Sequence, residues 1–110
     1  MLNLRLFMLQ RITALLMAPL VTGHLMVMIY AIQGGLSAEE ILGRTQGSAL
    51  WFLFYGTFVV AVSIHGAIGV RTVVHEWGGL KGKTLDACMW IIGLGLLVLG
   101  AQAVWAVTFA

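Results

Sequence analysis

The segment SIHGAIGVRTVVHEW, residues 63–77, places a histidine and a charged cluster directly after a long apolar run. His65 lies six residues before Arg71 and is followed by glycines at positions 66 and 69. An ionisable side chain is expensive inside a membrane, so a histidine in an apolar segment indicates a functional role. A hydrogen bond between two helices is the simpler explanation for a single histidine.

The neighbouring glycines favour haem as the partner of His65. A porphyrin bound to this imidazole would lie nearly parallel to the helix and press on the adjacent turn, where Gly69 leaves room for it. Neutral imidazole is a common axial ligand of haem iron. Arg71 and the basic residues near it would be able to neutralise the haem propionates. A histidine of another chain would be the natural second axial ligand.

A second histidine, His24, lies in an earlier apolar segment and has Gly23 beside it. It stands about 20 Å beyond Arg11 along a helix, at 1.5 Å per residue. His24 is therefore a candidate ligand for a second haem, at a different depth from the first. Two such haems would form an electron path across the membrane. An interhelical hydrogen bond is again the alternative, so one haem and two both stay open.

Three further residues could contribute to a quinone pocket at the inner ends of the apolar segments. Arg11 offers hydrogen-bond donors for a quinone carbonyl, Glu76 a carboxylate for proton transfer, and Trp77 an aromatic wall. Two of them also have simpler explanations. Arg11 could be an anchor whose charge extends to the membrane surface, and Trp77 could be an aromatic at the membrane interface.

The composition identifies the elements that must position these residues. The chain has 110 residues, of which 61% are hydrophobic and 9% are charged, whereas soluble domains carry about 25% charged residues. Three apolar stretches without Asp, Glu, Lys or Arg span residues 12–33, 46–70 and 87–110. Each exceeds the roughly 20 residues that cross a bilayer. We therefore expect an all-α integral membrane bundle of three transmembrane helices.

The expected bundle forms one domain over residues 1–110, with helices at about 12–33, 46–74 and 85–109. Ser37 and Glu40 resemble a capping box and predict a short interfacial helical turn in the first connection. Gly78 and Gly79 should end the second helix, and Thr84 with Asp86 should cap the third. Close helix approach is expected at three glycines of the third segment, Gly93, Gly95 and Gly100.

The basic residues predict the orientation. Five lie on one side of the expected spans and only Arg44 lies on the other; the five are Arg5, Arg11, Arg71, Lys81 and Lys83. The positive-inside rule places that side in the cytoplasm, so the N-terminus is cytoplasmic and the C-terminus faces outward. The net charge of +2 and the scattered basic residues do not indicate nucleic-acid binding.

Two stretches of the chain, LQRITALLMAPLVTGHLMVMIY and FVVAVSIHGAIGVRTVVHEW, resemble the cytochrome b membrane-anchor subunits of succinate dehydrogenase and fumarate reductase. That family carries H-R-x-[ST]-G on its first helix and H-x-x-x-G-[IV]-R, followed by an acidic residue, on its second. Here the second pattern reads from His65 through Gly69 to Arg71, with Glu76 after it. Gln10 stands where the first pattern has its histidine.

The resemblance implies an electron-transfer role in a succinate:quinone or quinol:fumarate oxidoreductase. His65 would be an axial ligand of haem b, and His24 would serve a second haem shared with a partner anchor. Arg11 would lie at the quinone site. Glu76 and Trp77 occupy the positions where the companion anchor carries an acidic residue and a tyrosine.

The implied partners are a flavoprotein subunit, an iron–sulfur subunit and a second membrane anchor. The dicarboxylate chemistry would reside in these partner subunits, and the implied location is a bacterial inner membrane. A haem-free structural anchor and a small membrane transport subunit are the alternative functions. The second is less favoured because no Asp or Glu lies inside an apolar stretch.

Overall fold

The computed structural model describes residues 2–109, and their secondary structure is entirely helical. The helices are α1 (Leu2–Gln33), α2 (Ala38–Thr45), α3 (Ala49–Gly78) and α4 (Gly82–Thr108). Three of them, α1, α3 and α4, are long and apolar enough to cross a membrane. The structure thus confirms the all-α bundle of three spans.

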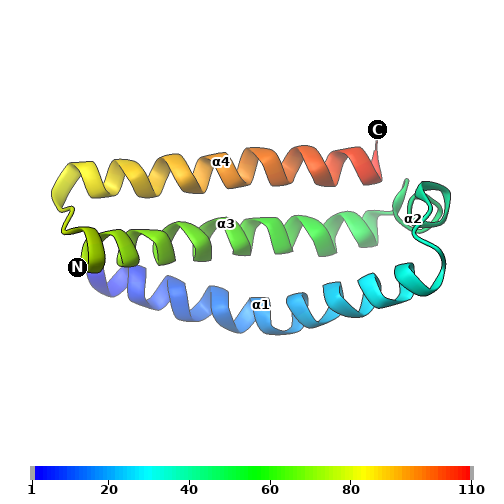
Figure 1. Cartoon of the computed structure of the whole chain (residues 1–110), viewed down its shortest axis with the longest axis horizontal. Coiled ribbons are helices and arrows are strands. Elements are labelled where there is room, and N and C mark those ends of the chain that lie inside the picture. The colour runs from blue at the N-terminus through cyan, green and yellow to red at the C-terminus, as the bar shows by residue number, and fades with distance from the viewer. Residues whose placement is uncertain (1, 110) are drawn as a thin grey trace.

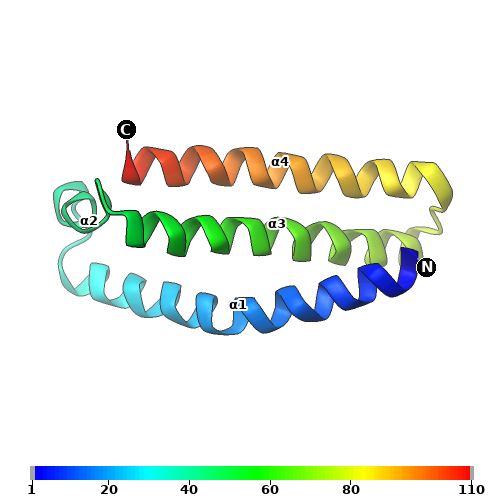
Figure 2. The same cartoon turned by 180° about the vertical axis from the view of Figure 1, so that it is seen from behind.

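The middle position in the bundle belongs to α3, which packs against α4 on one side and α1 on the other (Figures 1 and 2). The N-terminus and the α3–α4 connection lie at one end, whereas α2 and the C-terminus lie at the opposite end (Figure 1). The bundle is 47 Å long, which exceeds the hydrocarbon thickness of about 30 Å. Both ends therefore reach the polar interfaces.

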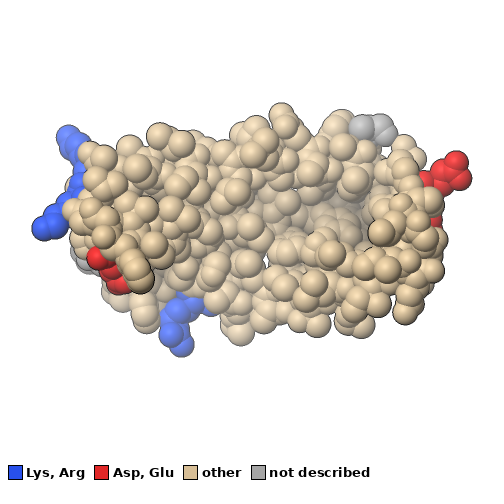
Figure 3. Space-filling model, in the orientation of Figure 1, with Lys and Arg blue, Asp and Glu red and all other residues tan. Residues whose placement is uncertain are grey.

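Charged side chains are confined to the ends of the bundle in the view of Figure 3, and its middle carries none. The visible Lys and Arg side chains gather toward the end with the α3–α4 connection, while acidic side chains are visible at both ends. Many large apolar side chains are exposed, such as Leu15 and Ile91. In a bilayer these side chains contact lipid or partner helices instead of water.

The first spanning helix begins earlier than its apolar stretch suggested. It starts at Leu2 instead of about residue 12, so Arg5 and Arg11 lie within it. The helix starts early because the residues before Arg11 are mostly good helix formers and include no Gly or Pro. It continues through Pro19 and is visibly bowed (Figure 1).

The connections match two of the three predicted helix signals. Ser37 caps α2, its hydroxyl accepting a 3.1 Å hydrogen bond from the Glu40 N–H. Gly79 ends α3 in the left-handed conformation, with φ 71°. The predicted cap of α4 is wrong, because α4 begins at Gly82 after Lys81 and no side chain caps it. Asp86 lies inside the helix, where it has another partner.

Small residues set the distance between α3 and α4. A Cβ built on Gly100 would lie 2.5 Å from Val59 Cγ1, and one on Gly93 would lie 3.1 Å from Ala67 Cβ. These two glycines allow the close approach that the sequence predicted. The third one, Gly95, has no such neighbour within 4 Å.

The helix α2 is fixed to the end of the bundle by polar contacts. Arg44 pairs with Glu40 at 2.7 Å, and its guanidinium lies 5.3 Å from the Tyr30 ring centre and 5.9 Å from that of Trp51. Thr45 donates a 2.7 Å hydrogen bond to the Val107 carbonyl near the end of α4. Arg44 therefore holds α2 against α1 and α3 through its ring contacts, in addition to carrying the single positive charge expected on this side.

Candidate functional site

His65 projects from α3 toward α1 and is half-buried. Its Nδ1 atom lies 3.3 Å from the hydroxyl of Thr13, a buried residue of α1. A polar contact between helices therefore occupies one of the two ring nitrogens. The neighbouring residues Gly66 and Ala67 face α4, where they lie close to Leu96 and Gly93.

The turn after His65 faces α1 through Gly69. A Cβ on Gly69 would lie 3.5 Å from the Gln10 side-chain nitrogen, an ordinary van der Waals distance. The amide of Gln10 thus covers the notch that the missing side chain leaves. Gly66, the other glycine beside His65, faces α4, since its Cβ would lie 3.3 Å from Leu96 Cδ1. Only Gly69 is placed to relieve crowding on the α1 side.

A partly polar cavity of about 460 Å³ opens between α1 and α3 at this level. Its polar lining comes from Gln10, Arg71 and Thr72, and Gly69 forms part of its wall. The Gln10 side-chain oxygen is buried and has no hydrogen-bond partner among the described residues. A buried amide oxygen without a donor is costly, so a donor from a bound group or a partner chain would stabilise this side chain.

An ion pair holds Arg71 at the cavity's edge. Its Nε and Nη2 atoms each lie 3.2 Å from Asp86 Oδ1 on α4. Within the described chain Arg71 is therefore not a free cation for a propionate, as its sequence position had suggested. Its charge is already partly balanced, and any anion would compete with Asp86.

The second histidine sits in a different environment. The His24 ring packs edge-on against Tyr55 and Phe58 of α3, with ring centres 6.0 and 5.3 Å apart. Its Nδ1 is buried, with no partner among the described residues. Gly23 allows this approach, because a Cβ there would lie 3.2 Å from the Phe54 ring. Eleven residues separate His24 from Thr13, about 16 Å along α1.

The three candidate quinone residues are not enclosed by this chain. Arg11 is exposed with its guanidinium 5.5 Å from the Phe7 ring centre, Glu76 is exposed, and Trp77 is 87% exposed. They also differ in level. Gln10, next to Arg11, lies beside Gly69, and Glu76 is seven residues further along α3, about 10 Å away. A pocket containing all three needs walls from another subunit.

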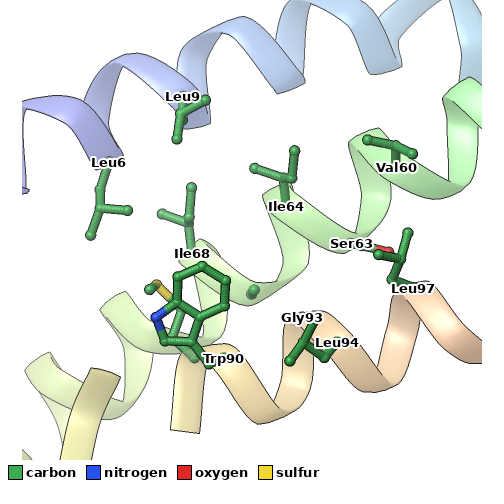
Figure 4. Close-up of a pocket in the computed structure, with 12 residues that line it drawn as sticks. Leu6, Leu9, Val60, Ser63, Ile64, Ile68, Trp90, Gly93, Leu94 and Leu97 are labelled. Atoms are coloured by element: carbon green, nitrogen blue, oxygen red, sulfur yellow. The ribbon is translucent and has the colours of Figure 1, made fainter. Parts of the chain in front are cut away.

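A second cavity, of about 320 Å³, is almost entirely apolar. Leu6 and Leu9 of α1, Ile64 and Ile68 of α3, and Trp90 of α4 surround it (Figure 4). It shares Leu6 and Ile68 with the polar cavity, so the two lie next to each other. Its apolar lining suits a hydrocarbon chain.

Sequence reasoning did not assign a role to Thr13 or Gln10. Both contacts depend on the axial offset of α1 against α3, which is set by packing between the two helices. Residue depth counted from Arg11 and Arg71 would have placed Thr13 about 3 Å and His65 about 9 Å from one boundary. The sequence feature that could have indicated the contact with His65 is the hydroxyl of Thr13 in an otherwise apolar helix.

Comparison with protein families gives one match, which covers residues 2–109. The family is described as the succinate dehydrogenase/fumarate reductase transmembrane subunit. Comparisons with curated proteins and with solved structures gave no match.

Proposed function

Because the chain belongs to the family of succinate dehydrogenase/fumarate reductase transmembrane subunits, we propose that it binds haem b through His65 and contributes to a quinone site at the inner end of its bundle. Bound there, haem b would supply one-electron redox chemistry between an iron–sulfur subunit and quinone. The observation that carries this proposal is the half-buried His65, which has one ring nitrogen engaged by Thr13 and the other available.

The residues around His65 fit a haem ligand. An axial histidine ligates through one nitrogen while the other is held by a neighbouring group, and Thr13 is such a group. Gly69 lacks a side chain one turn along, and the unpartnered Gln10 oxygen marks a polar position beside it. The chain supplies one ligand at this depth, so a second anchor subunit would supply the other.

His24 meets fewer of these conditions. Its ring packs against aromatic rings, and its Nδ1 has no hydrogen-bond partner among the described residues. We keep His24 as the candidate ligand of a second haem, which would require an orienting group from the partner anchor. One haem is the proposal that this chain's own contacts favour.

The quinone site is proposed where α1 and α3 meet the inner surface. Arg11 would donate hydrogen bonds to a quinone carbonyl, Glu76 would exchange protons, and Trp77 would form a wall. The exposure of all three supports a site completed by another subunit. Long arginine side chains extend toward the interface, and this reach would offset the difference in level between Arg11 and Glu76.

The proposed partners are a flavoprotein subunit, an iron–sulfur subunit and a second membrane anchor. The dicarboxylate reaction would belong to the soluble subunits. We propose a bacterial inner membrane as the location. The charge distribution supports a cytoplasmic N-terminus, with the basic end toward the soluble subunits.

The direct test is the haem content of the purified complex carrying His65→Ala. The reduced-minus-oxidised spectrum should lose a b-type band relative to the wild type, because the other two histidines, His24 and His75, lie at other depths. His75→Ala is the matched control, since His75 is exposed and its Nδ1 lies 2.8 Å from the Leu80 carbonyl just beyond the end of α3.

Two results would contradict the haem proposal. One is a wild-type complex without a b-type band, and the other is a His65→Ala complex with unchanged haem. Either result would favour the haem-free structural anchor, in which the contact between His65 and Thr13 only joins two helices.

A further inference from the structure

We infer that Thr13 is a positioning residue for His65, because its hydroxyl fixes the imidazole tautomer that leaves Nε2 free to bind iron. This inference rests on the proposed haem function. It assigns a supporting role to Thr13 of α1, whereas the proposed iron ligand, His65, belongs to α3. It also assigns the direction of the hydrogen bond between them.

The direction follows from counting acceptors around the Thr13 hydroxyl. Its oxygen lies 2.8 Å from the Leu9 carbonyl and 3.1 Å from the Gln10 carbonyl. Carbonyl oxygens only accept, so the single hydroxyl proton must point toward them. The hydroxyl oxygen can then only accept a hydrogen bond from His65. Nδ1 must carry the proton, and Nε2 keeps its lone pair.

The position of the hydroxyl is fixed by its surroundings. Thr13 is 3% exposed, and a threonine whose hydroxyl bonds the preceding turn of its helix has few side-chain rotamers. The contact of Gln10 beside Gly69 lies one turn away and holds α1 against α3 at this level. Thr13 is therefore a rigid acceptor for His65.

Other hydroxyls in the spans do not have this arrangement. Thr22, Ser63 and Thr72 each donate to the carbonyl four residues earlier on their own helix. In the part of the chain that the structure describes, these three have no recorded side-chain partner. His24 illustrates the consequence, because its Nδ1 has no acceptor there.

The hydrogen bond should affect the haem as well as the ligand. A histidine that donates its second N–H is a more basic ligand, and a more electron-rich ligand stabilises ferric over ferrous iron. Loss of the acceptor should therefore shift the haem midpoint potential in the positive direction.

The test compares three variants in the assembled complex. Thr13→Val keeps the shape of the side chain but removes the hydroxyl, and Thr13→Ser retains the hydroxyl. Thr22→Val is the matched control on the same helix. We expect a positive shift of the midpoint potential for Thr13→Val alone, with the wild-type value for Thr13→Ser and Thr22→Val.

A second measurement does not depend on haem. The ¹⁵N shifts of labelled histidines in the full chain, in micelles, report which ring nitrogen carries the proton. His65 should be protonated at Nδ1 in the wild type and Thr13→Ser, and should become a mixture of tautomers in Thr13→Val. Signals that disappear in His65→Ala identify the residue.

An unchanged potential and an unchanged tautomer in Thr13→Val would refute the inference, as would an equal shift in Thr22→Val. If His65→Ala retained its haem, the proposed function would fail instead. The tautomer measurement would still decide the hydrogen bond in that case, and it would also decide it if Thr13→Val did not assemble.

Discussion

Substitution of Gly100 by alanine should destabilise the contact between α3 and α4. The new Cβ would lie 2.5 Å from Val59 Cγ1, 3.0 Å from Cγ2 and 3.3 Å from Cβ. Carbon atoms that are not bonded pack at about 3.5–4.0 Å, so the first contact is too short by at least 1 Å. Val59 has one strongly preferred rotamer in a helix and cannot turn away, and the helices must therefore separate.

The expected cost is an overpacking penalty of about 1–3 kcal/mol. The higher helix propensity of alanine offsets it by roughly 0.5–1 kcal/mol. Gly95→Ala is the matched control, because a Cβ there meets no atom within 4 Å. The control should lose no stability unless a partner subunit covers Gly95.

The difference in stability between Gly100→Ala and Gly95→Ala can be measured by unfolding the full chain in mixed micelles with increasing amounts of a denaturing detergent. Gly100→Ala should unfold at a lower detergent fraction than Gly95→Ala, and Val59→Ala should restore most of the loss by removing the clashing methyl groups. If the two glycine variants behaved alike, the close approach of α3 and α4 at Gly100 would be incorrect.

The remaining predictions concern the inner end of the bundle. Arg11→Ala should impair quinone reduction by the complex while leaving succinate oxidation with a soluble acceptor intact. The control, Arg5→Ala, should spare both activities. Equal loss of both activities in Arg11→Ala would indicate an assembly role. Asp86→Asn should cost at most about 1 kcal/mol of unfolding free energy, because Asp86 is 37% exposed in its pair with Arg71 and such pairs contribute little. A loss of several kcal/mol in the same detergent titration would show that the pair is shielded from solvent in the complex.

The three spans could be predicted from the sequence because each depends on local composition alone. A stretch of 20 apolar residues has no stable alternative to a helix in a bilayer. The cap at Ser37 and the stop at Gly79 are equally local, and the structure contains both. The start of α1 was wrong by ten residues because the prediction took a charged residue as a helix boundary. Charge marks where a span leaves hydrocarbon, and a helix can continue into the interface.

The partners of the charged residues were not predictable in this way. Asp86 satisfies the local rule for a helix cap, yet it pairs with Arg71 on the preceding helix. A cap rule considers only the residue's own chain segment, whereas the position of Asp86 also depends on how α4 packs against α3. Gly66 and Gly69 show the same limit. They look equivalent beside His65, but one faces α4 and the other faces α1.

The two histidines show what the fold adds to the sequence. In the sequence each is an imidazole with a glycine beside it in an apolar helix. In the structure the Nδ1 of His65 lies 3.3 Å from the Thr13 hydroxyl, while the Nδ1 of His24 has no hydrogen-bond partner among the described residues and its ring packs against aromatic rings. A ligand whose second nitrogen is unsupported can rotate and is a weaker donor. Under the haem proposal, a second haem at His24 would require an acceptor from the partner anchor, because among the described residues the Nδ1 of His24 has no hydrogen-bond partner.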